Sequence, residues 1–219
     1  MKNIVAIDVG NSETTVGVGN NLSWKSYRYT TRKTITSDEL FMMFKTTIDP
    51  ESINDENLDG SIICSVVPQI TDSVIEATKR FTSKTVKNVG PGIKTGLKVN
   101  IDNPKELGPD RIANSVGGFK MAKKTVVIID LGTATTFDIV NNKKEYLGGS
   151  IAPGIKISLE ALTSKTSSLK SVEISNPKSV IGKNTYEAIQ SGLILGHASM
   201  IDSMLEKIIL EIDSEPKII

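Results

Sequence analysis

Two short segments of this 219-residue chain place a carboxylate at the end of an apolar run and follow it with glycine and small polar residues. The first reads Asp8-Val9-Gly10-Asn11-Ser12-Glu13-Thr14-Thr15, and the second reads Asp130-Leu131-Gly132-Thr133-Ala134-Thr135. Backbone amides, small hydroxyls and a carboxylate oxygen are the groups that bind nucleotide phosphates and their Mg²⁺. Each segment therefore predicts a phosphate-binding turn, although a plain β-hairpin with Asp-x-Gly turn chemistry has the same pattern.

The presence of two copies favours phosphate binding over a plain hairpin. Aligned without gaps, Asp8 matches Asp130, Gly10 matches Gly132 and Thr14 matches Thr136. Four apolar residues precede each Asp, so each copy predicts a buried strand, a tight turn and a second strand. Each copy opens about half of the chain. We therefore expect an α/β fold of two related nucleotide-binding domains, residues 1–115 and residues 116–219.

A third segment, Gly108-Pro109-Asp110-Arg111, precedes a helical pattern and carries a carboxylate beside a guanidinium. Pro109 suits the first turn of a helix, where no amide donor is needed. Alone, Asp110 would be a first-turn acid that favours the helix dipole, and Arg111 would be a surface ion-pair partner. Between two phosphate motifs, a functional role for this pair is the better interpretation.

Other local patterns predict the elements that must position these residues. Thr36 and Glu39 form a capping box for a helix that runs to about Thr47. Glycines in residues 147–154 predict a turn that leads into a helix from Ile155. We also expect a strand at residues 61–67 that ends before Pro68, and a helix after it. A long helix is expected from Tyr186 to about Ile212, and the start of a strand at residues 216–219.

Composition excludes several classes of protein. The chain has 26 basic and 25 acidic residues, which argues against a dedicated nucleic-acid surface. Its one cysteine, Cys64, cannot form an internal disulfide, and we expect it to be a small buried hydrophobe. The N-terminus does not resemble a secretory signal, and no apolar run is long enough to span a membrane. We expect a cytoplasmic protein with no nucleic-acid and no membrane partner.

The two phosphate motifs resemble those of the superfamily of acetate and sugar kinases, heat-shock chaperones and actin. Three further motifs are similar to those of the type III pantothenate kinases, and they occur in that family's order over nearly the whole chain. They are Gly108-Pro109-Asp110-Arg111-Ile112-Ala113-Asn114, Gly148-Gly149-Ser150-Ile151-Ala152-Pro153-Gly154, and Ile181-Gly182-Lys183-Asn184-Thr185 followed by Ala188-Ile189-Gln190-Ser191-Gly192.

The resemblance implies duplicated actin-like, ribonuclease H-like domains with mixed sheets flanked by helices and an ATP cleft between them. It implies an ATP-dependent kinase that phosphorylates the primary hydroxyl of pantothenate to 4′-phosphopantothenate, the first step of coenzyme A biosynthesis. The implied cofactors are ATP, Mg²⁺ and a monovalent cation, K⁺ or NH₄⁺. The implied assembly is a homodimer, with the long helix as a contact.

The resemblance also assigns roles to individual residues. Asp8, Val9, Gly10, Asn11, Ser12, Glu13, Thr14 and Thr15 would contact the ATP phosphates, with Asp8 facing Mg²⁺. Asp110 would be the general base, Asp130 would hold the monovalent cation, and Thr133 would touch ATP. Gly108, Pro109, Asp110, Arg111 and Thr185 would bind pantothenate.

Several residues receive a weaker interpretation. Thr185 is also a candidate N-cap for the helix that follows it. We expect Asp138 to face the opposite side of its strand from the side that Asp130 faces, and the solitary His197 receives no role.

The chain departs from the family pattern in two places. Ile101 stands where the family has a tyrosine that lines the substrate pocket. At residues 216–219 the family continues with a glycine-rich turn near the adenosine, so the second domain is expected to be incomplete at its C-terminus. Two other functions remain open, a regulatory relative that assists transcription and a kinase for another small molecule such as a sugar.

Overall fold

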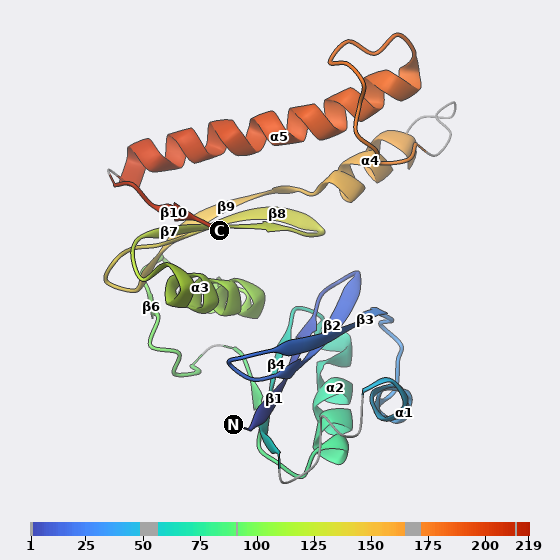
Figure 1. Ribbon diagram of the computed structural model, residues 1–219, viewed down its shortest axis with the longest axis vertical. Coiled ribbons are helices and arrows are strands. Elements are labelled where there is room, and N and C mark those ends of the chain that lie inside the picture. The colour runs from blue at the N-terminus through green and yellow to red at the C-terminus, as the bar shows by residue number, and fades with distance from the viewer. Residues whose placement is uncertain (1, 49–56, 91, 165–171, 213) are drawn as a thin grey trace. The chain divides into compact units, whose positions relative to one another are not determined.

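The structure is a computed structural model that describes residues 2–48, 57–90, 92–164, 172–212 and 214–219 (Figure 1). The chain divides into two compact units. The first unit comprises Met1–Leu97 and Asp102–Val116, and the second comprises Lys98–Ile101 and Gly117–Ile219. Each unit contains one five-stranded sheet.

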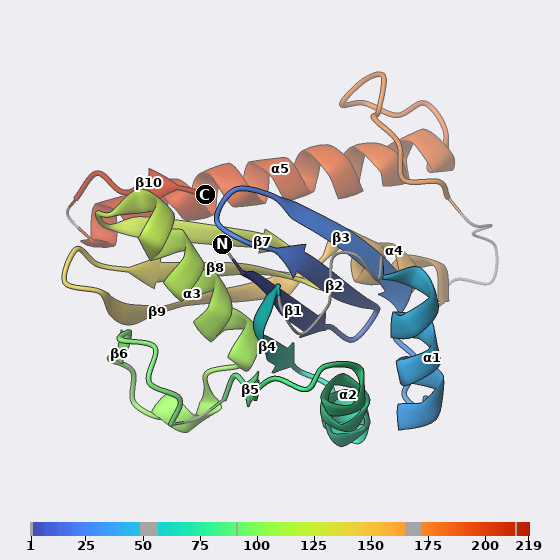
Figure 2. The ribbon, with the colours of Figure 1, turned by 60° about the horizontal axis from the view of Figure 1, so that its bottom comes forward.

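The sheet of the first unit has the strand order β3-β2-β1-β4-β5 (Figure 2). Its strands are β1 (Asn3–Val9), β2 (Glu13–Gly19), β3 (Trp24–Thr30), β4 (Leu58–Ser65) and β5 (Val86–Asn88). β1, β2 and β3 are antiparallel neighbours, whereas β4 is parallel to both β1 and β5. Parallel neighbours need a crossover connection, and the helices α1 (Ser37–Thr47) and α2 (Pro68–Phe81) provide it.

One face of this sheet packs against α1 and α2. Val5, Ile7 and Val9 alternate along β1 as buried residues, because successive side chains of a strand point to opposite faces. The residues that complete this core include Val16, Val18, Leu40, Phe44, Ile63, Ile70, Val74 and Ala77. Asp8, which lies between buried residues of β1, therefore faces away from the helices.

The predicted boundaries of α1 and α2 are confirmed at their N-termini. Thr36 caps α1 through its side chain, which accepts a hydrogen bond from the Glu39 amide at 3.2 Å, and Glu39 accepts one from the Thr36 amide at 2.9 Å. α2 begins at Pro68. The strand predicted at residues 61–67 is present, but β4 begins earlier, at Leu58, and ends at Ser65.

The sheet of the second unit has the strand order β10-β7-β8-β9-β6. Its strands are β6 (Lys98–Val99), β7 (Val126–Leu131), β8 (Ala134–Val140), β9 (Glu145–Pro153) and β10 (Lys217–Ile218). β7, β8 and β9 are antiparallel neighbours, and the short edge strands β10 and β6 run parallel to β7 and β9. The strand predicted from residues 216–219 is confirmed as β10.

The prediction of a turn at residues 147–154 is wrong. These residues form most of β9, which pairs with β8 from Tyr146 to Pro153. Gly148 has a φ of 124° and lies next to a register shift in the β8–β9 ladder, so the glycines there allow an irregular strand instead of a turn. Hydrogen bonding along a whole neighbouring strand outweighs the local preference of glycine for turns.

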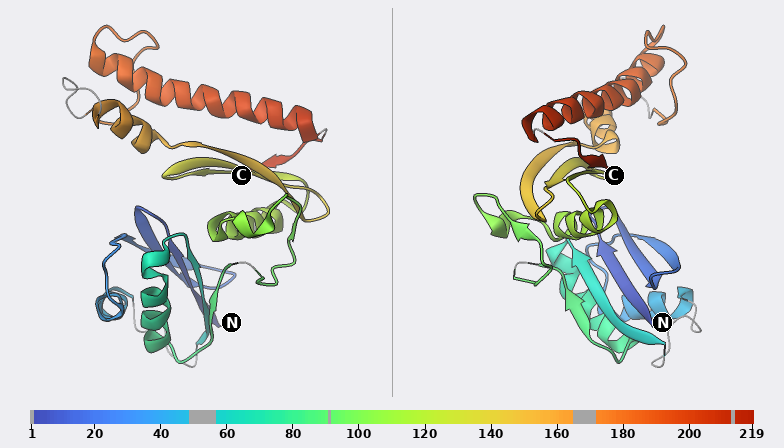
Figure 3. Two further views of the ribbon diagram at one scale, coloured as in Figure 1. Left: turned by 180° about the vertical axis from the view of Figure 1, so that it is seen from behind. Right: turned by 60° about the vertical axis from the view of Figure 1, so that its left-hand side comes forward.

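Helices cover both faces of the second sheet (Figure 3). α5 (Thr185–Ile212) packs on one face, where Ile208 joins Val127, Phe137 and Ile139 in a buried cluster. On the other face, Gly118 of α3 (Pro109–Ala122) lies so close to Ile128 that an added Cβ would sit 2.5 Å from its Cγ1. α4 (Ile155–Ser164) follows β9 and contacts α5. A short 3₁₀ helix, η2 (Pro104–Glu106), precedes α3.

The predicted fold class is confirmed. Each unit has a mixed sheet flanked by helices, and each sheet contains an antiparallel hairpin that carries one phosphate motif. These are the two α/β units with mixed sheets flanked by helices that the sequence predicted. Within the described ranges, no helix has the length and apolar character needed to cross a lipid bilayer.

Candidate active site

The first phosphate motif forms the turn between β1 and β2. The Gly10 amide donates a hydrogen bond to the Glu13 carbonyl at 2.9 Å, and a Cβ on Gly10 would lie 3.0 Å from that oxygen. Glycine at this position therefore lets the turn close tightly. Asn11, Ser12 and Glu13 are exposed at its tip, and Glu13 lies 3.9 Å from the guanidinium of Arg28 on β3.

Thr31, which sequence reasoning missed, holds this turn in place. Its hydroxyl donates a hydrogen bond to the Gly10 carbonyl at 2.7 Å, and its amide donates one to the Ser12 carbonyl at 3.0 Å. The Thr31 Oγ1 also lies 2.9 Å from the Oγ1 of Thr14. No local sequence pattern marks Thr31, because it reaches the turn only through the pairing of β3 with β2.

Strand register decides which side chains of the motif face away from the helices. Asp8 lies opposite Thr15 on β2 and opposite Cys64 on β4, so these three residues form a row on the face of the sheet that α1 and α2 do not cover. Val9 and Thr14 lie opposite each other on the buried face. Their side chains point into the core, which leaves only their backbone groups for a ligand.

The thiol of Cys64 connects the row to Asp110. Burial, the neighbouring carboxylates of Asp8 and Asp110, and a hydrogen bond from the thiol to Asp8 raise the pKa of Cys64 well above its usual range. Cys64 is 8 % exposed, as expected for a small buried hydrophobe. Its position shows that Asp8 and Asp110, which lie 102 residues apart in sequence, share one neighbourhood in the first unit.

Asp110 and Arg111 occupy the first turn of α3, which begins at Pro109. Asp110 Oδ1 accepts a hydrogen bond from the Arg111 amide at 2.8 Å, and a Cβ on Gly108 would lie 2.5 Å from the same oxygen. Glycine at position 108 thus leaves room for the Asp110 carboxylate to fold back over the helix N-terminus. The dipole of α3 favours a negative charge there.

The second phosphate motif forms the turn between β7 and β8. The Gly132 amide donates a hydrogen bond to the Ala134 carbonyl at 3.0 Å, and Asp130 lies opposite Thr136. Thr133 is exposed in the turn. The Gly154 amide donates to the Thr133 carbonyl at 3.1 Å, and a Cβ on Gly154 would overlap the carbonyl oxygens of Gly132 and Thr133. The start of α4 is therefore packed directly on this turn.

The register corrects the alignment of the two motifs by one residue. Asp8 lies opposite Thr15, whereas Asp130 lies opposite Thr136. Thr15 is therefore the structural counterpart of Thr136, and the match of Thr14 with Thr136 is wrong. The reason is that three residues separate β1 from β2, while two separate β7 from β8.

The predicted orientation of Asp138 is also wrong. Asp130 lies opposite Thr136, and Asp138 is two residues further along β8, so all three side chains share one face of the sheet. Asp138 is fully buried and accepts hydrogen bonds from the Tyr146 hydroxyl at 2.7 Å and the Thr136 hydroxyl at 3.3 Å. Strands alternate with a period of two, which places positions 136 and 138 on the same side.

The structure adds detail at three further residues of the second unit. Thr185 is the exposed first residue of α5, and the helix is capped by Asn184, whose side chain accepts a hydrogen bond from the Glu187 amide at 2.9 Å. His197, which sequence reasoning left without a role, lies with Nε2 2.9 Å from Oγ1 of the buried Thr135. Ile101 lies close to Gly148, since its Cγ2 would be 3.9 Å from a Cβ placed there.

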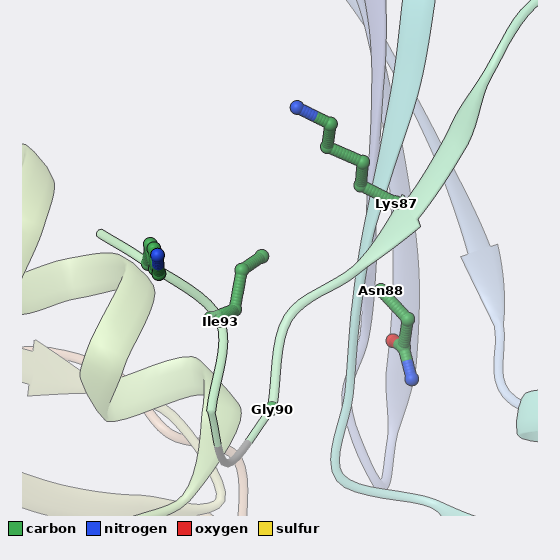
Figure 4. Close-up of a pocket in the computed structure, with 5 residues that line it drawn as sticks. Lys87, Asn88, Gly90 and Ile93 are labelled. Carbon is green, nitrogen blue, oxygen red and sulfur yellow. The ribbon is translucent and has the colours of Figure 1, made fainter.

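A hollow of about 580 Å³ lies beside β5 in the first unit (Figure 4). It is lined by Lys87, Asn88, Gly90, Ile93 and Lys94. None of these residues belongs to the predicted site.

Among the described residues, no three His, Cys, Asp or Glu side chains gather closely enough to hold a metal alone. A metal ion bound by these residues would therefore need waters or substrate oxygens to complete its coordination.

Comparison with known proteins agrees with this architecture. A solved structure described as a conserved putative Baf family transcriptional activator from Campylobacter jejuni superposes with a TM-score of 0.55 at 19 % identity, over 91 % of this chain and 78 % of that chain. At this identity the likeness shows the fold alone.

Sequence relatives are more specific. The chain is 41 % identical over 217 residues to the type III pantothenate kinase of Halalkalibacterium halodurans and, over the same length, to that of Persephonella marina. Both matches cover 99 % of this chain and 85 % of the relative. The family model of type III pantothenate kinase matches residues 4–207. These matches show that the chain belongs to the type III pantothenate kinase family.

Proposed function

We propose that this protein transfers the terminal phosphate of ATP to the primary hydroxyl of pantothenate and forms 4′-phosphopantothenate, the first step of coenzyme A biosynthesis. The observation that carries the proposal is the shared neighbourhood of Asp8 and Asp110 around the Cys64 thiol, in a chain of this family. A carboxylate beside a phosphate turn and a second carboxylate close to it are what a phosphoryl transfer to a hydroxyl requires.

Asp110 is proposed to accept the proton of the attacking hydroxyl. The hydroxyl oxygen forms a bond to the terminal phosphorus, the bond from that phosphorus to the bridging oxygen breaks, and ADP leaves. The Arg111 amide donates a hydrogen bond to the Asp110 carboxylate, and Gly108 has no side chain that would displace that carboxylate. The base is therefore positioned before substrate arrives. Arg111 is proposed to bind the carboxylate of pantothenate, for which a guanidinium supplies two parallel donors.

The backbone of residues 8–15 is proposed to contact the ATP phosphates, and Thr133 is proposed to contact ATP. Asp8 and Asp130 are proposed to bind Mg²⁺ and a monovalent cation, K⁺ or NH₄⁺, respectively. Such ions neutralise charge on the phosphates during transfer. Their oxygen preference fits the carboxylates present, since Asp8 is exposed next to Thr15, and Asp130 is half-buried opposite the Thr136 hydroxyl. Gly108, Pro109 and Thr185 are proposed to line the pantothenate pocket.

We further propose that the protein is a cytoplasmic homodimer. The single cysteine is free and buried, which fits a reducing compartment. Large apolar side chains are exposed on α4 and α5, among them Ile157, Leu162, Tyr186 and Leu210, and association would remove such apolar surface from water. Light scattering of the purified protein during gel filtration measures the assembly directly.

Release of ADP from MgATP tests the function. We expect release only when pantothenate is present, and faster release in K⁺ or NH₄⁺ than in Na⁺ at equal ionic strength. Sugars and acetate serve as control acceptors. Turnover of a sugar instead of pantothenate would assign another small-molecule kinase, and ATP binding with no turnover of any acceptor would favour a regulatory role.

A further inference from the structure

Asp138 is a fully buried carboxylate for which the phosphoryl transfer described above has no use. It lies on β8, with Ile128 opposite it on β7 and Gly149 opposite it on β9, in the middle of the second sheet. Removing a carboxylate from water costs free energy unless hydrogen bonds compensate for the lost hydration. Asp138 has such bonds, since Oδ1 accepts from the Tyr146 hydroxyl at 2.7 Å and Oδ2 accepts from the Thr136 hydroxyl at 3.3 Å.

The duplicated fold itself does not require a carboxylate at this position. Since Thr15 is the counterpart of Thr136, the residue of the first unit that corresponds to Asp138 is Gly17. There the ring of Trp24 covers the strand, with Cε3 3.2 Å from a Cβ placed on Gly17. The same hairpin is thus built without any polar side chain at this point, which indicates that Asp138 serves something specific to the second unit.

The Thr136 hydroxyl connects Asp138 to Asp130. Thr136 lies directly opposite Asp130 on the neighbouring strand. Its hydroxyl has a single proton, which it donates in a hydrogen bond to Asp138. Its oxygen is then an acceptor only, on the sheet face that carries the Asp130 carboxylate. The diagonal neighbours Asp130 and Asp138 have Cα atoms roughly 7–8 Å apart in such a ladder, so the Asp138 carboxyl group lies close to the same region.

We propose that Asp138 is a positioning residue for the monovalent cation at Asp130. Tyr146 fixes the Asp138 carboxyl group, which accepts the proton of the Thr136 hydroxyl and so leaves the Thr136 oxygen as an acceptor for K⁺ or NH₄⁺ beside Asp130. Hydrogen-bond partners of metal ligands commonly tune affinity in this way. The inference rests on the proposed role of Asp130.

The test uses the complete chain and measures the melting temperature as KCl replaces NaCl at constant ionic strength, together with the K⁺ dependence of ADP release. Wild-type protein establishes first whether K⁺ stabilises the fold. Two variants follow: Asp138→Asn, which keeps the shape but replaces a carboxyl oxygen with an amide donor, and Thr136→Val, which removes the hydroxyl. Ile139→Val, on the opposite face of the same strand, controls for general loss of packing.

We expect each of the first two variants to raise the K⁺ concentration of half-maximal stabilisation by about ten-fold or more. Because both act through one hydroxyl, the double variant should be no weaker than the worse single variant. MgATP affinity and the KM for pantothenate should stay within two-fold of wild type, roughly the range of a neutral substitution. If Asp138→Asn does not fold, Thr136→Val alone carries the comparison.

Two results overturn the inference while leaving the kinase function intact. The first is a lower melting temperature with an unchanged K⁺ midpoint, which means that Asp138 is only structural. The second is an unchanged K⁺ midpoint with a raised pantothenate KM, which places Asp138 at the substrate instead. Absence of any K⁺ effect in the wild-type protein removes the cation site at Asp130, and the inference with it, while pantothenate-dependent ADP release still decides the proposed activity separately.

Discussion

The Oγ1 atom of Thr135 lies 2.9 Å from Nε2 of His197, which ties α5 to the strand that follows the second phosphate turn. The structural counterpart of Thr135 in the first hairpin is Thr14, whose Oγ1 lies 2.9 Å from that of Thr31. Both threonines are almost fully buried. Each phosphate turn is therefore anchored by a buried hydroxyl whose partner comes from outside the hairpin.

Removal of the His197 side chain should destabilise the second unit. His197→Ala leaves the Thr135 hydroxyl buried without this partner, so we expect the free energy of unfolding to fall by about 1–3 kcal/mol. Urea unfolding followed by circular dichroism measures the change. The double variant with Thr135→Val should cost less than the sum of the two single variants, whereas Ser199→Ala, exposed on α5, should have little effect. Additive costs for His197 and Thr135 would show that their contact contributes nothing.

A side chain at position 154 should disturb the second phosphate turn. Gly154→Ala places a methyl group against the carbonyl oxygens of Gly132 and Thr133, so the turn or the start of α4 must shift. Overpacking of this kind costs about 1–3 kcal/mol. We expect weaker ATP binding by calorimetry together with the loss of stability. The matched control is Gly117→Ala on α3, where a Cβ meets nothing within 4 Å and ATP binding should be unchanged.

Asp110→Asn should lose turnover but keep the fold. The amide preserves the shape and can still accept a hydrogen bond from the Arg111 amide, but it cannot accept the substrate proton. General base catalysis contributes about 10²–10⁴-fold, and we expect kcat to fall by that factor with ATP affinity unchanged. Asp38→Asn, in the first turn of α1, is the control for loss of a helix N-terminal charge and should retain full turnover. Wild-type activity in the Asp110 variant would remove the base assignment.

Cys64 should be unreactive in the folded protein. Burial and the carboxylates of Asp8 and Asp110 raise the pKa of its thiol, so the nucleophilic thiolate is scarce even in mild alkali. We expect iodoacetamide at pH 8.5 to leave Cys64 unmodified in the native state and to alkylate it after unfolding in urea, as measured by mass spectrometry. Rapid labelling of the native protein at that pH would contradict the buried contact with Asp8.

The same shift predicts a pH dependence of stability. At pH values well below 9.0, the ordinary pKa of a cysteine thiol, Cys64 is protonated in both the folded and the unfolded protein. Above that pH the unfolded thiol ionises while the folded thiol does not, so stability should fall as the pH rises further. The decline of the free energy of unfolding with pH should be less steep in Cys64→Ala than in wild type, by a difference that grows from pH 8 and approaches roughly one proton by pH 10.

The sequence by itself predicted the elements whose signals are local. The capping box of Thr36 and Glu39, the helix start at Pro68 and the two hairpins depend on contacts between residues a few positions apart. Short-range hydrogen bonds and backbone preferences determine such features wherever the segment lies in the fold. The duplicated motif and the order of the further motifs also predicted the fold class and the family, since both are readable without coordinates.

Tertiary structure alone decided which residues meet. The row of Thr15, Asp8 and Cys64, the anchoring of a phosphate turn by Thr31, and the contact of Thr135 with His197 each require a strand register or a helix packing that no local pattern encodes. Register also corrected the expected side of Asp138 and the alignment of Thr14, because a shift of one residue moves a side chain to the other face of a sheet. Residues 147–153 became part of a strand because β8 offered hydrogen-bond partners to most of their backbone, which a turn could not.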